Sequence, residues 1–293
     1  MDKKMGASLY GFSGLLGCMA WLPASALACT LWGAAGPDAG GGTLISKNRD
    51  WKPDHHQVLK RVRPKNGLAY LGLYAEGNED PGIKAGVNEK GLTIISASSN
   101  VPKKLSMAGT DLHGVMNRIM AGYASIDAVL ADADSLFGHT WPNYFLISDR
   151  SRLLTVEIGL NGQYSTKLAD HGVATHTNHY LDPAMPEFAA FKVGASSATR
   201  LARIDTLLAE ASRPLSAARF SVMSRDQNAG PDRSLWRTGS GHNAQTLASW
   251  IVETPPSGPS RLHLVIANPG EAETTRDLLL DEAFWQQAPG PLN

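Results

Sequence analysis

The chain has 293 residues, which is too long for a minimal disulfide scaffold and suits one large domain or two small ones. Hydrophobic residues make up 43% of it and charged residues 18%, so it has ample material for a core and disorder is not expected. Its 27 Lys and Arg residues balance its 27 Asp and Glu residues, which argues against a nucleic-acid-binding protein, because such a protein would need a basic face. Two cysteines cannot form a zinc ribbon or a framework of several disulfides.

The first 28 residues have the order of a secretory signal peptide. Two lysines precede an apolar stretch over residues 9–22, which is followed by Pro23 and by small residues that end at Ala28. The apolar stretch is short for a membrane span and is interrupted by glycines, so the mature protein is not expected to contain a transmembrane segment. Cleavage after Ala28 would leave Cys29 as the N-terminus of a periplasmic or secreted domain over residues 29–293.

Cys29 would then be the single thiol of the mature chain, because Cys18 lies in the signal segment. A free N-terminal cysteine in an exported protein has two good explanations. It can carry a lipid anchor, although a lipobox normally has leucine three residues before the cysteine, where this chain has Ala26. It can also be a nucleophile whose own α-amino group serves as its base, since the ordinary pKa values of a thiol and an α-amine, about 8.5 and about 7.7–8.0, lie close together.

Short segments of alternating hydrophobicity, separated by Gly, Pro and Asn turns, predict strands at the start of the mature chain. These strands are expected over residues 43–51, 57–62, 68–75 and 91–98. Apolar residues at helical spacing then predict a helix from Leu112 to Tyr123, capped by Thr110 and Asp111, and a second helix from near Ser125. Further strands are expected over residues 144–148, 153–158 and 163–168.

The last third of the chain predicts two helices and a hairpin. One helix is expected to begin around Ser197, with Ser196 and Ser197 as routine caps, and another covers residues 217–223. Residues 246–253 and 261–266, joined by a turn of Pro, Gly and Ser, have the pattern of a β-hairpin. The sequence contains no repeat, low-complexity segment or dividing linker, so it indicates one α+β domain whose sheets are covered by helices.

A charged segment over residues 46–51 ends a predicted strand about 20 residues after Cys29, with a glycine-rich turn between them. A hairpin of this length would bring Asp50 back beside the N-terminus, where its carboxylate could hold the α-amine. Arg49 or Lys47 could favour the thiolate form of the cysteine. The alternative is a surface cluster of ion pairs, which is common in proteins.

Two further polar segments contain candidate site residues. Asn178, in a polar run after strand-like residues, could donate its amide to a tetrahedral oxyanion, although such an asparagine is more often a turn residue. Arg200 is expected in the first turn of the helix near Ser197, where it would oppose the helix dipole, and this position indicates a specific partner.

Three other patterns could indicate a zinc site, a phosphate-binding loop or a papain-like catalytic pair. His171, His176 and His179 do not have a standard zinc spacing. The glycine-rich run 36–42 lacks the Gly-Lys-Ser/Thr that completes a phosphate-binding loop. A histidine could pair with Cys29 as in papain, but the sequence around the cysteine is not of that type, and an N-terminal cysteine needs no histidine.

Five segments fall in an order that resembles the N-terminal-nucleophile cysteine hydrolases, from Cys29 to about Pro269. This group contains the choloylglycine hydrolases, namely bile salt hydrolase and penicillin V acylase, and the related isopenicillin N acyltransferases. The segments that support the resemblance are Cys29-Thr30, Lys47-Asn48-Arg49-Asp50-Trp51, Gly86-Val87-Asn88-Glu89-Lys90-Gly91-Leu92, Thr177-Asn178-His179 and Ser196-Ser197-Ala198-Thr199-Arg200.

The resemblance implies an αββα sandwich of two antiparallel sheets between helix layers, with no metal or organic cofactor. It also implies hydrolysis of a linear amide through a thioester. By position, Cys29 corresponds to the nucleophile and Asp50 to the aspartate that holds the amine. Asn178 matches the oxyanion-hole asparagine, and Arg200 matches the arginine near the thiol and the carboxylate. Asn100 falls near the family's second oxyanion contact, although its spacing in the sequence differs.

One departure from the family concerns the position three residues before Asp50. Bile-salt and penicillin V enzymes carry arginine there, whereas this chain has Lys47, and Arg49 directly precedes Asp50. Lysine keeps the charge but lacks the planar fork of arginine. The departure disfavours a bile-salt enzyme and favours the acyltransferase side of the group.

The sequence therefore predicts a secreted or periplasmic amidase that acts on a small-molecule amide, with Cys29 as its nucleophile. Acyl transfer on the same fold is one alternative, and a lipid-anchored binding protein acylated at Cys29 is another. A papain-like peptidase that uses a histidine is a third. Bile salts, penicillins, N-acyl amino acids and acyl-homoserine lactones all stay open as substrates, and the oligomeric state is not readable from the sequence.

Overall fold

Two antiparallel sheets form the centre of the molecule in the computed structural model, which describes residues 28–77, 80–106 and 112–292. The predicted signal segment, apart from Ala28, and the predicted cap at Thr110 and Asp111 lie outside the described residues. The first sheet contains, in spatial order, β10 (Gly172–His176), β1 (Cys29–Ala35), β2 (Thr43–Trp51), β11 (Gln245–Thr254), β12 (Ser260–Ile266) and β13 (Thr274–Leu280). The second contains β14 (Gly290–Pro291), β3 (His56–Val62), β4 (Tyr70–Glu76), β5 (Gly82–Asn88), β6 (Thr93–Ser98), β7 (Asn143–Ser148), β8 (Leu153–Ile158) and β9 (Tyr164–Ala169).

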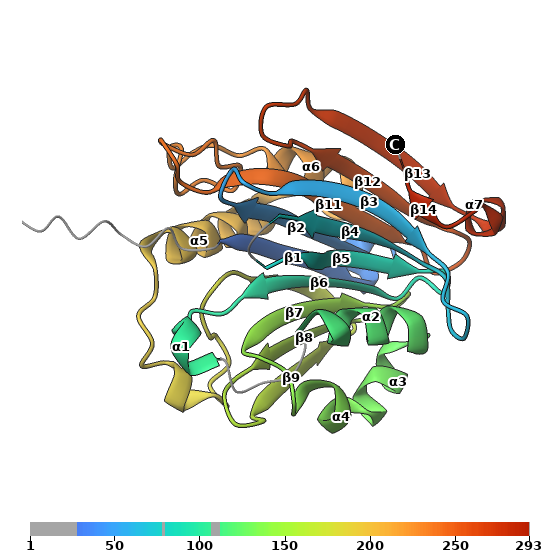
Figure 1. The fold of residues 1–293 in the computed structure, drawn as a ribbon, viewed down its shortest axis with the longest axis horizontal. Coiled ribbons are helices and arrows are strands. Elements are labelled where there is room, and N and C mark those ends of the chain that lie inside the picture. Colours follow the sequence, from blue (N-terminus) through green and yellow to red (C-terminus); the bar gives the residue numbers. More distant parts are fainter. Residues whose placement is uncertain (1–27, 78–79, 107–111, 293) are drawn as a thin grey trace, which may run out of the picture.

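Helices cover the outer faces of both sheets. The second sheet is covered by α2 (Leu112–Gly122), α3 (Ile126–Ala131) and α4 (Ala133–Phe137), and the first by α5 (Ala195–Glu210) and α6 (Ala217–Ser224). The other helices are α1 (Lys103–Ser106), α7 (Glu282–Gln286), whose aromatic residues pack into the cluster between the sheets, and short 3₁₀ helices at Gly36–Ala39 and Pro186–Phe188. Figure 1 shows α2, α3 and α4 together at the lower right, away from α5 and α6. The expected α+β sandwich is therefore confirmed.

Three apolar clusters hold these layers together. One lies between the two sheets and includes Leu31 and Trp250. A second joins α2–α4 to the second sheet, and a third joins α5 and α6 to the first sheet. Side chains alternate between the faces of a strand, so Leu31 of β1 faces the other sheet while its neighbour Trp32 packs against the helices.

Both faces of β1 are buried, because it lies inside the sandwich with helices on its outer side. Such a strand has no polar face and therefore lacks the alternating pattern of a half-exposed strand. This explains why the sequence pattern did not predict β1, and the glycine-containing β5 and the largely polar β13 were missed as well. The predicted strand over residues 43–51 is confirmed to the residue by β2, and Ser125 does cap α3, its side chain accepting from the Ala128 N–H.

The motif at residues 86–92 is a turn that joins β5 to β6 and is organised by Asn88. The Asn88 Oδ1 accepts from the N–H groups of Lys90 and Leu92, at 3.0 and 3.1 Å, and its Nδ2 donates to two carbonyls at the end of α2. Gly91 has a φ of +85°, which other residues rarely adopt. The motif thus serves to fix the turn and to dock α2.

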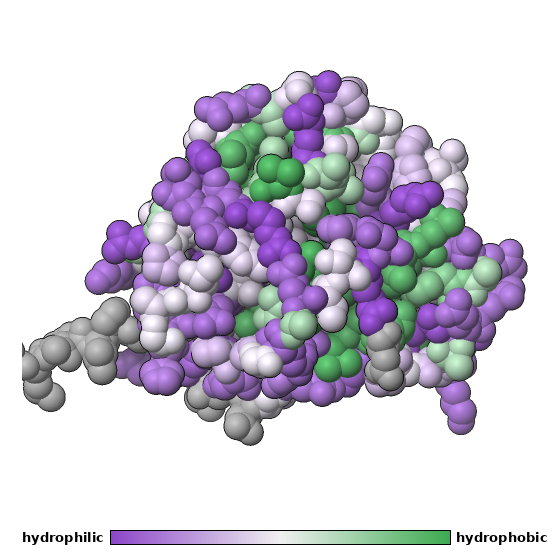
Figure 2. Space-filling model, turned by 90° about the horizontal axis from the view of Figure 1, so that it is seen from above, coloured by the Kyte–Doolittle hydropathy of each residue, from purple (hydrophilic) through white to green (hydrophobic). Residues whose placement is uncertain are grey.

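Hydrophilic side chains cover most of the face shown in Figure 2, and apolar residues are exposed in several separate places. Scattered apolar surface of this kind is ordinary for globular proteins. Within the part of the chain that the structure describes, every helix is too short or too polar to span a bilayer.

Candidate active site

Cys29 is the first residue of β1 and is buried, with 3% of its surface exposed. In the antiparallel pair of β1 with β2 it lies opposite Arg49, and Leu31 lies opposite Lys47. Paired residues project to the same face of a sheet, so Cys29, Lys47 and Arg49 all point into the space between the two sheets. The sandwich thus places two cations beside the thiol.

A cavity of about 20 Å³ adjoins the thiol, which is room for one water molecule. Residues from both sheets and from α2 line it, namely Cys29, Lys47, Arg49, Asp80, Ile83, Lys84, Ser96, Ser98, Met116 and Asn143. Lys84 and Ser98 could not be predicted as site residues. The local sequence around them does not indicate that β5 and β6 face β1 across the sandwich.

The pKa of the Cys29 thiol is set by opposing effects. Burial is the largest and raises the pKa, and the carboxylate of Asp50 raises it further. The positive charges of Lys47 and Arg49, with a hydrogen bond from the Asp50 backbone, outweigh both, so the pKa is lowered overall. A lowered thiol pKa increases the fraction of thiolate, which is the reactive form.

Lys47 is held inside the sandwich by carbonyl oxygens. Its Nζ donates to the Lys84 carbonyl at 3.0 Å and to the Ser96 carbonyl, and burial lowers its pKa to about 8. Lys84 forms an ion pair with Asp80 at 2.8 Å, and its pKa is lowered to about 7, first by burial and then by the charge of Arg49. Lys47 and Arg49 are 1% and 2% exposed, so the alternative of a solvated surface cluster is wrong.

The backbone of Cys29 is bound by Asn178 and Arg200. The Cys29 N–H donates to Asn178 Oδ1 at 3.0 Å, and Arg200 Nη2 donates to the same oxygen at 2.9 Å. Arg200 Nη1 donates to the Cys29 carbonyl at 2.6 Å and to Thr30 Oγ1 at 2.7 Å. Asn178 Nδ2 donates to the Ser98 carbonyl at 2.9 Å, which ties the site to the second sheet.

The start of α5 differs from the expectation. The helix begins at Ala195 with Gly194 as its N-cap, so Arg200 lies in the second turn, away from the unpaired N–H groups of the helix end. Ser197 does not cap the helix, because its Oγ accepts from the Asn178 N–H at 2.9 Å. That bond helps to orient Asn178 toward Cys29.

Asp50 lies on the other face of β2, opposite Thr246 of β11. Its Oδ1 accepts from Thr246 Oγ1 at 2.7 Å, whereas its Oδ2 has no hydrogen-bond partner among the described residues. Burial raises the pKa of this carboxyl, and the charges of Arg237 and Arg200 act in the opposite direction. The structure thus places the carboxylate next to two cations, while the Cys29 nitrogen is bonded to Asn178.

Asn100 follows β6 and is not among the residues that line the cavity beside Cys29. Its Oδ1 accepts from the Tyr144 hydroxyl at 3.1 Å, and its Nδ2 donates to the carbonyls of Phe191 and Lys192. In these contacts the side chain ties the loop after β6 to the segment before α5.

The histidines considered for zinc have separate partners. His176 pairs with Glu157 at 2.9 Å, His179 contacts Ser197 at 2.8 Å, and His171 pairs with Asp170 on the surface. Within residues 28–77, 80–106 and 112–292, no three His, Cys, Asp or Glu side chains are grouped as metal ligands.

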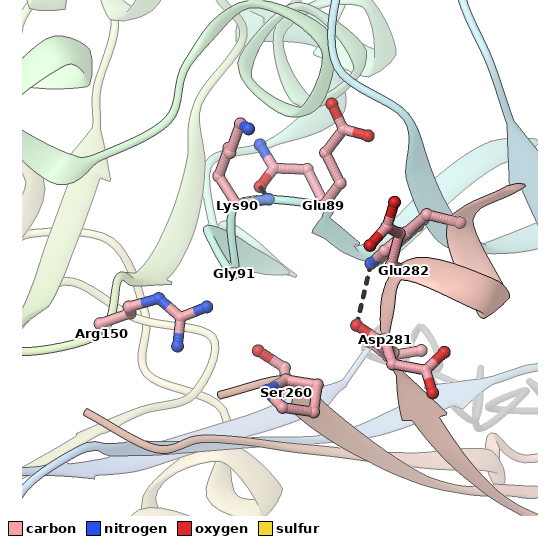
Figure 3. A pocket seen from close by; sticks show the side chains of 11 residues that line it. Glu89, Lys90, Gly91, Arg150, Ser260, Asp281 and Glu282 are labelled. Atoms are coloured by element: carbon pink, nitrogen blue, oxygen red, sulfur yellow. Dashed lines mark hydrogen bonds between the residues drawn. The ribbon is translucent and has the colours of Figure 1, made fainter. Parts of the chain in front are cut away.

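A larger polar pocket, of about 390 Å³, lies beside the β5–β6 turn and does not include Cys29. Figure 3 shows Glu89, Lys90 and Arg150 across from Ser260 and the start of α7. Charges of both signs line it, and it lacks a nucleophilic thiol. The smaller cavity beside Cys29 is therefore the candidate active site.

Comparison with known proteins gives the family and the fold of this chain. The family described as acyl-coenzyme A:6-aminopenicillanic acid acyl-transferase matches residues 38–269. Two variants of conjugated bile acid hydrolase from Clostridium perfringens share the fold, with TM-scores of 0.53 and 0.52 at 13% identity over 86% of this chain and 98% of theirs. The N-acylethanolamine-hydrolyzing acid amidase ortholog of Caenorhabditis elegans has a TM-score of 0.54 at 12% identity, over 78% of this chain and 93% of its own.

Among proteins with curated descriptions, none matches this sequence. The expected relation to N-terminal-nucleophile hydrolases is nevertheless confirmed, because the family match covers most of the chain and the similar structures share its fold. This chain belongs to the acyl-coenzyme A:6-aminopenicillanic acid acyl-transferase family.

Proposed function

We propose that this protein is an exported cysteine amidase that hydrolyses linear amides through a thioester on Cys29. The observation that carries the proposal is the environment of this one residue. Its thiol has a lowered pKa beside Lys47 and Arg49, and its nitrogen is bonded to Asn178 Oδ1. The thiol and the nitrogen that would become an α-amine after cleavage belong to one residue and both have defined surroundings, which supports N-terminal-nucleophile catalysis.

Exposure of the amine is the first step of the proposed mechanism. In the full chain the Cys29 nitrogen belongs to a peptide bond with Ala28, and an amide nitrogen is not a base. Removal of residues 1–28 by signal peptidase, on export to the periplasm or beyond, turns it into an α-amine. Asn178 Oδ1 then holds an amine hydrogen, and the unpartnered Asp50 Oδ2 offers a second acceptor.

Catalysis then proceeds in two halves. The Cys29 sulfur attacks the amide carbon while the α-amine takes the thiol proton, and the same amine returns the proton to the departing amine. The second hydrogen of Asn178 Nδ2, beyond the one donated to Ser98, and a backbone N–H near Asn100 stabilise the oxyanion. Arg200 positions the Cys29 carbonyl, and water finally attacks the thioester to release the acid.

Acyl transfer is the second candidate, because the family is named for an acyl-transferase. An amine in place of water would then resolve the thioester. Lipid anchoring receives less support, because Cys29 is buried inside the sandwich and not at an exposed chain end.

Export of the full chain from a bacterial host, followed by intact-mass analysis, tests the first step. The expected product begins at Cys29 and carries no lipid, and it turns over a panel of N-acyl amides of varied acyl length. The Cys29→Ala variant should lose at least about 1,000-fold in kcat/KM. A mature protein that keeps Ala28, or a Cys29→Ala variant with full activity, would overturn the proposal. Added amines that capture the acyl group would instead support transfer.

A further inference from the structure

The cavity beside Cys29 has more positive than negative charge. Its described lining contains three cations, Lys47, Arg49 and Lys84, and one carboxylate, Asp80. Lys84 is paired with Asp80 at 2.8 Å, so Lys47 and Arg49 face the Cys29 thiol. A guanidinium stays charged in proteins, whereas burial lowers the pKa of Lys47 to about 8 and that of Lys84 to about 7. No carboxylate among the described residues is hydrogen-bonded to the guanidinium of Arg49. Buried charge without a partner is costly, so proteins keep it where a ligand supplies the opposite charge.

Among these cations, Arg49 has hydrogen-bond donors without an acceptor among the described residues. Lys47 already donates to two carbonyl oxygens, whereas Arg49 donates only Nη1, to the Asp50 carbonyl at 3.1 Å. The Nε and Nη2 atoms of Arg49 are buried and have no hydrogen-bond partner among the described residues. The guanidinium carbon lies 4.2 Å from the centre of the Trp51 ring, in a favourable cation–π contact. It is thus a rigid fork with two free donors.

We infer that Arg49 forms a subsite for a carboxylate, or a comparable acidic group, carried by the amide substrate. The inference rests on the proposed amidase function and adds the class of amide. A planar guanidinium binds carboxylates through two parallel hydrogen bonds, and lysine cannot reproduce that geometry. Cys29 and Arg49 are direct partners on neighbouring strands, and their side chains line the same small cavity. The acid must therefore lie within a few bonds of the scissile carbonyl.

The inference separates acidic amides from neutral ones. An N-acylglycine carries its carboxylate on the leaving amine, and an N-acylethanolamine of the same acyl chain has a neutral hydroxyl in that place. A third probe, the monoethanolamide of hexylmalonic acid, keeps the octanoyl chain and carries the acid on the carbon next to the scissile carbonyl, on the acyl side. Comparison of N-octanoylglycine, N-octanoylethanolamine and this third probe identifies both the need for the acid and its position.

The test compares kcat/KM for the three probes in the mature wild type and in Arg49→Gln. We expect one acidic probe to be preferred over the neutral one by about 10–100-fold, and Arg49→Gln to abolish that preference. Arg61→Gln is the matched control, because Arg61 is also buried and stacks on an aromatic ring, Phe284 at 4.4 Å, but does not line the cavity. This control should keep the preference.

Two results would overturn the subsite. One is a wild type without preference for either acid. The other is an equal loss on all three probes in Arg49→Gln, which would mean that Arg49 acts only on the thiolate. If no probe is hydrolysed, the amidase proposal fails, and the subsite is tested by alkylation of Cys29 with iodoacetamide. An acidic probe should then protect Cys29 in the wild type and not in Arg49→Gln, and no protection in the wild type would rule the subsite out.

Discussion

Two buried polar centres of this molecule differ in how their charges are balanced. Around Cys29, the cations Lys47 and Arg49 share one thiol, and Arg49 keeps two donors without partners. The pair Glu157–His176 joins β8 of one sheet to β10 of the other, with side-chain exposures of 3% and 1%. In this pair one carboxylate faces one imidazole that can carry a positive charge.

The Glu157–His176 pair is also the better bonded of the two centres. Glu157 Oε1 accepts from His176 Nε2 at 2.9 Å and from the backbone N–H groups of Leu181 and Asp182, and His176 Nδ1 contacts the Thr177 carbonyl. Only Glu157 Oε2 of this pair has no partner among the described residues. Matched partners indicate a role in holding the sheets together, whereas unmatched donors beside a nucleophile indicate a ligand.

Removal of Glu157 should have the largest effect on stability. Glu157→Ala leaves His176 and two backbone N–H groups without their acceptor, so we expect a loss of about 3–5 kcal/mol in the free energy of unfolding, measured by urea titration. The activity per folded molecule should stay within about twofold of the wild type. Glu76→Gln, in an exposed pair with Lys60, is the control and should cost less than about 1 kcal/mol. Equal losses in the two variants would contradict the comparison.

Arg200→Lys should reverse that pattern and affect activity more than stability. Lysine keeps a charge but cannot bond the Cys29 carbonyl, Thr30 and Asn178 at once. The nucleophile would shift, and kcat should fall by about 100-fold. Arg203→Lys, on the same helix in a partly exposed pair with Asp226, is the matched control and should retain activity. A fully active Arg200→Lys enzyme would show that the contacts to Cys29 are not needed for positioning.

Lys47→Met tests the cationic half of the Cys29 centre. The charge of Lys47 lowers the pKa of the thiol, so its removal should shift the pH profile of iodoacetamide alkylation upward by about one unit or more. Lys84→Met should shift the profile less, because the Lys84 charge is already paired with Asp80. An unchanged profile in Lys47→Met would mean that the thiolate is stabilised by other groups.

Lys47 also contributes a pH dependence to the stability of the protein. Burial lowers its pKa to about 8 from an ordinary 10.5, so between these values the unfolded chain keeps a proton that the folded protein has released. Stability should therefore rise with pH over this window, by up to about 1.4 kcal/mol per pH unit. In urea titrations from pH 7 to 10, the free energy of unfolding of the wild type should rise relative to that of Lys47→Met. A constant difference between the two would contradict the shift.

Local sequence patterns predicted those elements whose faces differ in polarity or that carry helical spacing. The strand over residues 43–51, the cap at Ser125 and the hairpin of β11 and β12 follow from such signals. β1 was not predicted because burial on both faces removes the alternation, and the start of α5 was misplaced because Ser197 binds Asn178 instead of capping the helix. Local preference fails where a distant partner changes what a side chain does.

The sequence by itself determined the candidate nucleophile and the order of the motifs. A cysteine after a predicted signal segment, and the segments around Asp50, Asn178 and Arg200, are local features of the chain. Only the tertiary structure decided which groups meet at Cys29. Lys84 and Ser98 reach it across the space between the sheets, and the Cys29 nitrogen is bonded to a residue 149 positions away. Contacts of that kind depend on strand register and sheet packing, which local patterns do not encode.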